Sequence, residues 1–372
     1  MKNLFYTTIL ILSIGLFGCK KKTKDPEPEA ETPVTGPSYV VPTTYTFSAM
    51  DYTTSVQRIA MLTEILNYIR TAHTTTASPA LSGTKLQEMY ANINNQFADP
   101  NLNGLTGVVE LKNKVDNTFN LQTDLNATLL DVGTITTPTT PVASNGVAGK
   151  ISNTVTAKAY IVDANGFEHK EIVEKGIMGG VFYYQAMTIM KNIGTYDNTT
   201  VIAGQGTAQE HAWDEAFGYF GVPAAFPTST VGLKNWGSYC NSVNPSIGSN
   251  TLIMNAFLKG RAAISNKDNT GRDQARDVVM ATWEKIGAAR FITYVKAAKA
   301  GITDDGTRNH SLSEAVGFIR AFKYNPNKTI SDAQITQLLG YIGTNLYTVT
   351  TTNLDNAINT MASIFNLDPN TL

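Results

Sequence analysis

Apolar side chains recur every three or four residues along most of this chain of 372 residues, and no other feature constrains its fold as strongly. Side chains at this spacing lie on one face of an α-helix. The clearest case falls between residues 51 and 72, where the pattern is carried by Val56, Ile59, Leu62, Ile65, Leu66 and Ile69. We therefore expect a long amphipathic helix in this segment, with its apolar face buried.

The same period predicts helices over much of the remaining chain. They cover about residues 85–97, 108–131, 168–191, 207–222, 251–266, 270–300, 310–322, 331–341 and 353–365. Residues 133–150 are rich in Thr, Pro, Ser and Gly and predict a surface loop. Residues 151–163 alternate and predict a short strand or an irregular stretch, whereas residues 224–250 predict a loop that packs as a lid or side wall. The expected fold class is an all-α helical bundle.

The N-terminus predicts export and lipid attachment. Residues 1–18 form an apolar leader of the secretory type. The Leu-Phe-Gly that precedes Cys19 resembles a lipobox, so we expect Cys19 to be lipidated. An ordinary signal peptide that ends near a cysteine is the alternative. Residues 19–44 predict a flexible tether, because their Lys, Pro and Glu cannot bury apolar area. The expected location is the cell envelope, with the lipid in the outer membrane and the body facing the periplasm or the cell surface.

Composition narrows the classes of partner. The net charge is -1 and no block of Lys or Arg occurs outside the tether, which argues against nucleic acid. With Cys19 lipidated, Cys240 is the only other cysteine, so we expect no intramolecular disulfide. No second long apolar run follows the leader, so only the lipid is expected to enter the membrane.

Two segments with the same order of residues contain two of the four histidines. In the first, His211 and Glu215 are four residues apart and share one helical face. In the second, His310 and Glu314 have the same spacing. Both glutamates are followed by Ala, one variable residue, Gly and an aromatic residue. This repetition predicts an internally duplicated bundle over residues 45–372, with halves of about residues 45–205 and 206–372.

A metal site is the more specific of two interpretations of these segments. Two facing helices could bring two imidazoles and two carboxylates together, and such donors suit iron, zinc or manganese. The candidate metal ligands are therefore His211, Glu215, His310 and Glu314. A buried hydrogen-bond network that pairs the same groups without a metal is the alternative. Further candidates for contact with a small ligand are Glu210, Trp213, Asp214 and Glu174, although a tryptophan is more often part of the core.

The predicted helix at residues 168–191 has an ambiguous start. Glu174 can add a carboxylate to the expected centre, whereas His169 is more typical of a solvated first turn, in which acidic neighbours favour the positive end of the helix dipole. Glycines weaken a helix, but they are tolerable where a neighbouring backbone or a ligand comes close. This predicted helix contains Gly176, Gly179 and Gly180.

The stretch Glu-His-x-Trp-Asp-Glu-Ala-Phe-Gly-Tyr at residues 210–219 resembles the signature of an uncharacterised lipoprotein family found mainly in Bacteroidota. Segments 51–66, 174–179 and 310–318 are similar to other blocks of that family. More distantly, the chain resembles the imelysin-like proteins. That resemblance implies a helical, exported, duplicated protein associated with iron uptake, and sometimes a metallopeptidase. Their motif is Gly-x-His-x-x-Glu, whereas the spacing from His211 to Glu215 is four residues.

Three functions follow as hypotheses. The first is an anchored envelope protein that binds a metal, such as iron or zinc, or a metal-containing ligand. The second is a metal-dependent hydrolase in which Asp214 or Glu210 acts as the base. The third is a non-catalytic scaffold or interaction protein whose motifs are structural.

Overall fold

The computed structural model describes residues 39–116, 118–154 and 156–372, in which helices joined by loops predominate and the strands form two small antiparallel sheets. The predicted all-α class is confirmed. The α-helices are α1 (Thr53–Arg70), α2 (Gly83–Ala91), α3 (Pro100–Asn103), α4 (Leu121–Ile135), α5 (His169–Ile177), α6 (Tyr184–Asn192), α7 (Ala208–Phe220), α8 (Asn235–Ile247), α9 (Ser249–Ser265), α10 (Asn269–Ala300), α11 (Asp305–Phe322), α12 (Asp332–Ile342) and α13 (Thr351–Phe365).

Short elements connect these helices. A π-helical segment, η2 (Met178–Tyr183), joins α5 to α6, and the 3-10 turns are η1 (Lys112–Lys114), η3 (Ile193–Thr195) and η4 (Leu346–Thr348). The strands β1 (Gly149–Ser152) and β2 (Ala159–Val162) pair antiparallel, with Gly149 opposite Val162, and so do β3 (Val201–Ile202) and β4 (Gly206–Thr207). The predicted signal peptide, Cys19 and most of the predicted tether lie outside the described residues.

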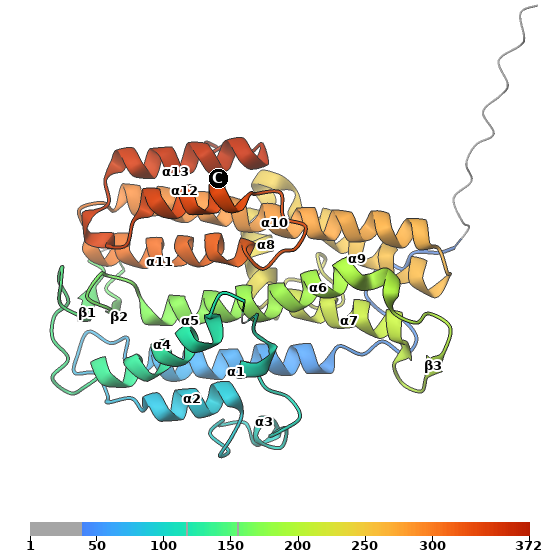
Figure 1. Cartoon of the computed structure of the whole chain (residues 1–372), viewed down its shortest axis with the longest axis horizontal. Helices are drawn as coiled ribbons and strands as arrows, with labels where there is room; N and C mark the ends of the chain where they lie inside the picture. Colours follow the sequence, from blue (N-terminus) through green and yellow to red (C-terminus); the bar gives the residue numbers. More distant parts are fainter. Residues whose placement is uncertain (1–38, 117, 155) are drawn as a thin grey trace, which may run out of the picture. The chain divides into compact units, whose positions relative to one another are not determined.

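The helices form layers around the continuous stretch α5–η2–α6 (Figure 1). On one side, α11 packs on α5, and the 32-residue helix α10 packs on α9, α11 and α13. On the other side, α1 packs on α5 and α7, and α4 packs on α5 and α2. Residues 39–372 form one compact unit, and the expected division into two repeated halves stays a prediction. None of the described helices is both long and apolar enough to span a membrane.

Two segments differ from the predictions. Much of residues 108–120, which the apolar spacing assigns to a helix, forms turns and η1, and α4 begins only at Leu121. Conversely, the expected loop at residues 224–250 contains α8, because Trp236 and Cys240 anchor that helix in the core despite Pro245 within it. The indole N–H of Trp236 donates to the carbonyl oxygen of Met178 over 2.9 Å.

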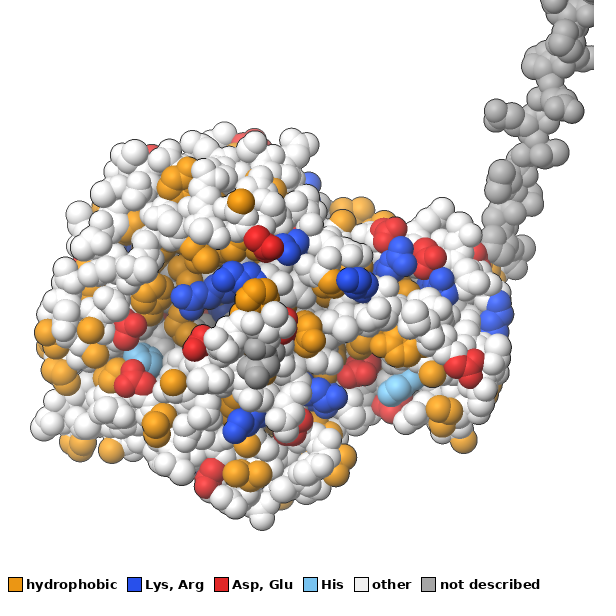
Figure 2. Space-filling view, viewed as in Figure 1, with side chains coloured by type: hydrophobic (Ala, Val, Ile, Leu, Met, Phe, Trp, Pro, Cys, Tyr) orange, Lys and Arg blue, Asp and Glu red, His pale blue; other side chains and the backbone are white. Residues whose placement is uncertain are grey.

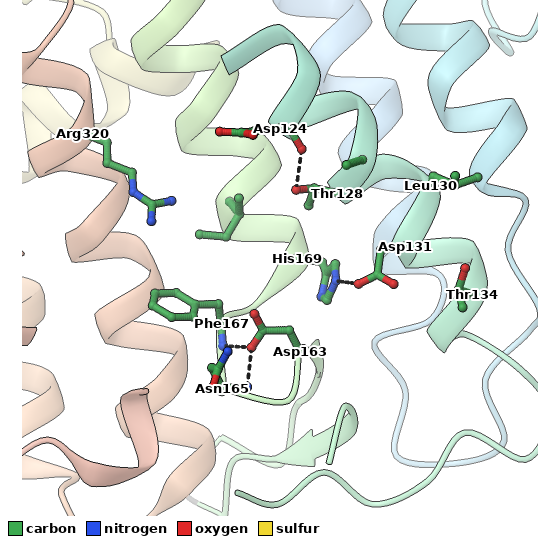
Figure 3. A pocket seen from close by; sticks show the side chains of 12 residues that line it. Asp124, Thr128, Leu130, Asp131, Thr134, Asp163, Asn165, Phe167, His169 and Arg320 are labelled. Atoms are coloured by element: carbon green, nitrogen blue, oxygen red, sulfur yellow. Dashed lines mark hydrogen bonds and ion pairs between the residues drawn. The ribbon is translucent and has the colours of Figure 1, made fainter. Parts of the chain in front are cut away.

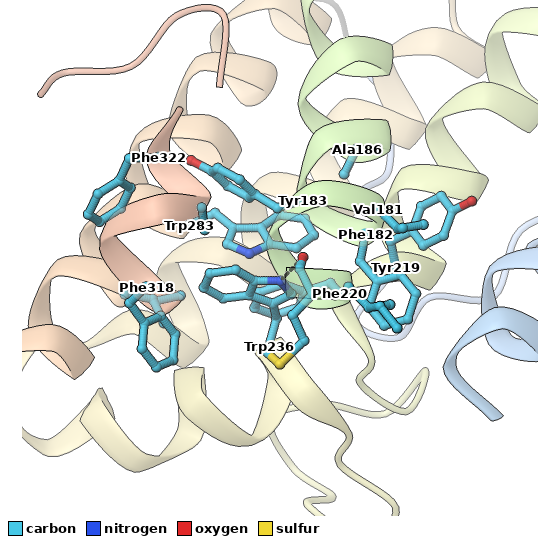
Figure 4. Packing of buried hydrophobic residues seen from close by; sticks show 14 of the residues in the cluster. Val181, Phe182, Tyr183, Ala186, Tyr219, Phe220, Trp236, Trp283, Phe318 and Phe322 are labelled. Atoms are coloured by element: carbon cyan, nitrogen blue, oxygen red, sulfur yellow. Dashed lines mark hydrogen bonds between the residues drawn. The ribbon is translucent and has the colours of Figure 1, made fainter. Parts of the chain in front are cut away.

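An aromatic cluster fills the centre of the molecule (Figure 4). Trp236 and Trp283 lie edge to face at 5.9 Å between ring centroids, and Phe220 lies 4.7 Å from Trp283. Tyr183 contacts both tryptophans from η2. Such rings bury large areas and attract each other through their edges and faces. The aromatic cluster thus joins α7, α8, α10 and η2.

The glycines at the start of η2 allow close contacts there. A Cβ at Gly180 would lie 1.9 Å from Cδ2 of Leu121, and one at Gly179 would lie 2.8 Å from Cβ of Ala321. The sequence leaves open whether a neighbour or a ligand approaches these glycines, and the structure places the side chains of α4 and α11 there.

The folded body begins with a tyrosine inserted into the core. Tyr45 is fully buried, and its ring stacks on Phe217 of α7 at 3.6 Å between centroids and 5° between planes. Its hydroxyl donates to Asp214 over 2.7 Å, and its backbone N–H donates to the carbonyl oxygen of Ala224 over 2.9 Å. We call this set of contacts the Tyr45 clamp.

Candidate metal centre

The candidate metal centre lies where the start of α5 faces α11. The acidic pair Glu168 and Glu171 lies three residues apart, so that both side chains share one face of α5. The backbone N–H of Glu168 donates to Oγ of Ser313 over 2.9 Å, which holds the start of α5 against α11. Gly317 lets these helices approach, because a Cβ there would lie 2.2 Å from Cβ of Lys175.

Three potential ligand atoms converge at this position. His310 Nδ1 lies 2.6 Å from Glu168 Oε2 and 3.8 Å from Glu171 Oε1. Ligand atoms of all three side chains lie within 4.8 Å of one another, and no other group of at least three His, Cys, Asp or Glu among the described residues does so. Both glutamates are buried and His310 is partly exposed. One imidazole and two carboxylates form a donor set that suits zinc, iron or manganese.

His73, just after α1, lies on the other side of Glu168. Its Nδ1 is 3.9 Å from Glu168 Oε1, and its buried Nε2 has no hydrogen-bond partner among the described residues. Burial and the charge of Lys170 lower the pKa of His73 to about 3, so the ring is neutral at pH 7, as metal binding requires. Tyr160 of β2 contacts both imidazoles, because it stacks on His310 at 4.5 Å and meets His73 edge to face at 5.8 Å. His73 is therefore a candidate fourth ligand.

Two buried lysines neutralise the carboxylates of this centre. Lys170 forms ion pairs with Glu171 and, at 2.8 Å, with Glu174. Lys175 Nζ lies 2.8 Å from both Glu171 Oε2 and Glu314 Oε2. The attraction between opposite charges this close offsets the free-energy cost of removing each charge from water. A metal that enters the centre must therefore compete with Lys170 for Glu171.

The local charges also determine where protons reside. Burial and the charge of Glu171 raise the pKa of Glu168, and they raise the pKa of Glu314 to about 7. Burial opposes protonation of His310, but the hydrogen bond that its protonated ring donates to Glu168, together with the charge of Glu168, outweighs burial and raises the pKa of His310. The Glu168–His310 pair is thus suited to hold a proton, and metal binding would displace it.

The first motif helix, α7, contributes to a different cluster. Asp214 Oδ1 accepts a hydrogen bond from Arg261 Nε over 2.9 Å, in addition to the one from Tyr45. Glu210 forms a capping box with Thr207 and lies 2.7 Å from Arg261 Nη1. The single buried arginine on α9 therefore satisfies both acids, and these contacts tie α7 to α9.

The structure does not bring the four expected metal ligands together. Glu215 accepts a hydrogen bond from the Tyr219 hydroxyl over 3.2 Å and lies 3.7 Å from Arg58 Nη1. His211 is partly buried on α7, and its Nδ1 has no hydrogen-bond partner among the described residues. The second pair belongs to the candidate metal centre, where His310 contacts Glu168 and Glu314 contacts Lys175.

Other predicted site residues also have definite positions. Glu174 is buried beside Lys170 at the edge of the candidate metal centre. Trp213 is fully buried in the core and donates to the carbonyl oxygen of Phe257 over 3.0 Å. The prediction of a solvated His169 is wrong, because this side chain is only 5% exposed and its Nε2 lies 2.7 Å from Asp131 Oδ2.

Sequence reasoning allowed for one carboxylate from residues 168–174 at the expected centre, but it did not place Glu168, Glu171 and His73 beside His310. The two glutamates have the pattern of a solvated first turn, and only the contact with α11 buries them. His73 lies beyond the last periodic residue of α1 and has no motif around it. The scarcity of histidine was the one available signal in the sequence. The structure shows that His73 and His310 share a contact with Tyr160.

The fold and this site define an all-α protein with a buried cluster of acidic, basic and imidazole side chains. The chain belongs to the family described as a domain of unknown function (DUF4856), whose model matches residues 42–367. No curated protein and no solved structure matches the chain. The resemblances to lipoproteins of Bacteroidota and to imelysin-like proteins stay predictions.

Proposed function

We propose that this protein binds a divalent metal ion, with iron and zinc as the first candidates, in the cell envelope, where lipid on Cys19 anchors it. The observation that carries the proposal is the convergence of Glu168, Glu171 and His310 within 4.8 Å of one another. Two carboxylates and one imidazole can hold such an ion, and the neutral ring of His73 offers a further nitrogen.

The buried lysines shape the expected binding behaviour. A dication would take the place of the Lys170 ammonium at Glu171 and of the proton held between Glu168 and His310. Affinity should therefore rise with pH until the Glu168–His310 pair has lost its proton. The wholly structural alternative is a charge network that the lysines satisfy permanently, and it predicts no dependence of stability on added metal.

The test compares two histidine variants of the chain. Protein purified without chelator is analysed for metal content, and its melting temperature is followed during titration with Fe²⁺, Zn²⁺ and Mn²⁺. At a free-ion concentration one hundred times Kd, bound metal should stabilise the native protein by about 2.7 kcal/mol. His310→Gln removes a proposed ligand and should weaken binding at least tenfold. His211→Gln is the matched control, since His211 is also partly buried but lies outside the candidate metal centre.

Three results would overturn the proposal. They are no stoichiometric metal together with no shift in melting temperature, equal binding by both variants, and loss of binding in His211→Gln alone. Should His310→Gln fold poorly, the wild-type protein gives a second readout. Its metal affinity must fall as the pH is lowered from 8 to 6, whereas a constant affinity would contradict ligands that exchange a proton for the ion.

A further inference from the structure

A cleft of about 690 Å³ lies on another face of α5 from the candidate metal centre. Its walls come from α4, from the start of α5, from the turn at residues 163–167 and from Arg320 of α11 (Figure 3). A second hollow of about 260 Å³ continues it and shares four lining residues, which are Asp124, Thr128, Ile172 and Arg320. The volume falls within the range of small-molecule sites in proteins. We call the two hollows together the α4–α5 cleft.

One end of the α4–α5 cleft carries more positive than negative charge, because several cations line the second hollow and Asp124 is the one acidic side chain among the described residues there. Arg320 and Lys323 lie three residues apart at the end of α11 and line the second hollow. Neither forms an ion pair with a carboxylate of the described residues, although the charge of Asp124 partly offsets the effect of burial on the pKa of Arg320. Lys323 Nζ lies over the Phe119 ring at 5.6 Å. Figure 3 shows the guanidinium of Arg320 extending into the cleft without a partner among the residues drawn. Cations left unpaired beside a hollow are available to an anionic group.

The other end carries acidic side chains. Asp131 Oδ2 contacts His169, and that hydrogen bond lowers the pKa of Asp131, which keeps the carboxylate ionised. Asp163 Oδ1 accepts the backbone N–H groups of Asn165 and Phe167. The second oxygen of each carboxylate has no hydrogen bond within the described part of the chain. These oxygens can accept hydrogen bonds from a cationic group.

The charges therefore have opposite signs at opposite ends of the α4–α5 cleft. In Figure 3, Arg320 and Asp131 stand on opposite sides of it, with Ile172 and Phe167 in the lining. Figure 2 shows the same face with Lys and Arg side chains gathered beside a hollow and a histidine flanked by acidic side chains. Complementary charges at both ends select a ligand by orientation as well as by class.

We infer that the α4–α5 cleft binds a dipolar organic ligand, namely a short peptide with free termini. Its carboxylate lies at Arg320 and Lys323, its ammonium group at Asp131 and Asp163, and its side chains on the apolar wall. A guanidinium forms paired hydrogen bonds with a carboxylate, which suits Arg320 to this role. A simple dication does not fit the basic end, and a simple anion does not fit the acidic end. The inference does not depend on the candidate metal centre.

The experiment uses the tripeptide Ala-Phe-Ala in four forms, which are unmodified, N-acetylated, C-amidated and blocked at both ends. Binding to the wild-type chain is measured by calorimetry at low salt and repeated at high salt, because exposed charges are screened. The unmodified peptide should bind most tightly. Since a hydrogen bond to a charged group contributes about 1.5–3 kcal/mol, blocking either terminus should weaken binding roughly tenfold to a hundredfold.

Variants then assign each terminus to one end of the α4–α5 cleft. The double variant Arg320→Met with Lys323→Met should bind the unmodified and C-amidated peptides equally. The double variant Asp131→Asn with Asp163→Asn, in which the amide oxygens can still accept the same hydrogen bonds, should bind the unmodified and N-acetylated peptides equally. Lys191→Met and Asp277→Asn change exposed charges outside the cleft and should behave as wild type.

Three kinds of result would contradict the inference or part of it. No binding of the unmodified peptide at millimolar concentration, or equal binding of all four forms, would overturn the inference. A preference that depends on one terminus only would overturn the dipolar assignment. Cleft variants that keep the wild-type order of the four peptides would show that binding occurs elsewhere on the chain.

Discussion

Glu314 illustrates how burial changes the chemistry of a motif residue. It lies one helical turn after His310, and the sequence suggests a metal ligand that is ionised at neutral pH. In the structure it faces Lys175 and Tyr239, and burial together with the charge of Glu171 raises its pKa to about 7. A carboxyl group in this setting takes up a proton much more readily than it would in the unfolded chain.

This pKa predicts how stability depends on pH. The group binds more protons in the folded state than in the unfolded state between about pH 4.5 and 7, so its contribution to stability is present below this window and declines as the pH rises through it. Glu314→Gln imitates the protonated form. We expect the variant to lose this decline, which could amount to about 1–3 kcal/mol. Urea unfolding at pH 4.5, 6 and 7.5 measures it. A wild-type and variant difference that stays constant with pH would contradict the prediction.

The site was only partly predictable from single residues. His310 and Glu314 belong to the candidate metal centre because their spacing places both on the side of α11 that faces α5. His211 has the same spacing, but the side of α7 on which Asp214 lies meets Arg261 of α9. Local periodicity tells which side chains share a face, whereas the partner of that face depends on how distant segments pack. For that reason Arg261 and Lys175 could not be assigned from the sequence.

Among the elements, helices with strong periodicity were the easiest to predict. The segment expected at 51–72 corresponds to α1, and the one expected at 270–300 corresponds to α10. The failures have physical causes. The residues before Leu121 have apolar side chains at mixed spacing, and Val109, Leu111 and Val115 become buried from turns and bends. In contrast, α8 is stabilised by the contacts of Trp236 although its sequence is rich in Asn and Ser. Tertiary contacts outweigh intrinsic helix propensity in both places.

The contact between α5 and α11 allows a test at the scale of helices. In Gly317→Ala the new Cβ would lie 2.2 Å from Cβ of Lys175, so the two helices must move apart. We expect a loss of stability of about 1–3 kcal/mol, as for other overpacked cores. Gly340→Ala in α12 is the matched control, because no atom lies within 4 Å of its new Cβ. That change should stabilise the protein by up to about 1 kcal/mol. Equal effects in chemical denaturation would rule out a special contact at Gly317.

For the whole molecule, the expected all-α architecture follows from the near absence of strand periodicity over long stretches of the chain. One large core then forms without a disulfide among the described residues, since Cys240 is buried as a free thiol. Most of the chain's buried apolar residues belong to a single connected cluster that joins helices from its start to its end. The length of the chain makes a core without a disulfide feasible, because longer chains bury a larger fraction of their surface on folding.

The proposed lipid anchor also concerns the whole molecule, and it has its own test. Cells fed radiolabelled palmitate should incorporate the label into the wild-type protein and into Cys240→Ser, but not into Cys19→Ser. The Cys19→Ser protein should move from the membrane fraction to the soluble fraction, because it lacks the proposed lipid. Label on Cys19→Ser, or an unchanged membrane fraction, would exclude lipid on Cys19 as the anchor.

The Tyr45 clamp has a mechanical consequence for a protein held by its N-terminus. Force applied from that end would reach Tyr39, whose hydroxyl donates to Asp268, and then Tyr45, whose ring and hydroxyl contact α7 and whose amide contacts the segment after α7. The force would therefore act on buried contacts before it reached α1, which follows in the sequence. If the chain is pulled from its N-terminus, these contacts must break before α1 can unfold.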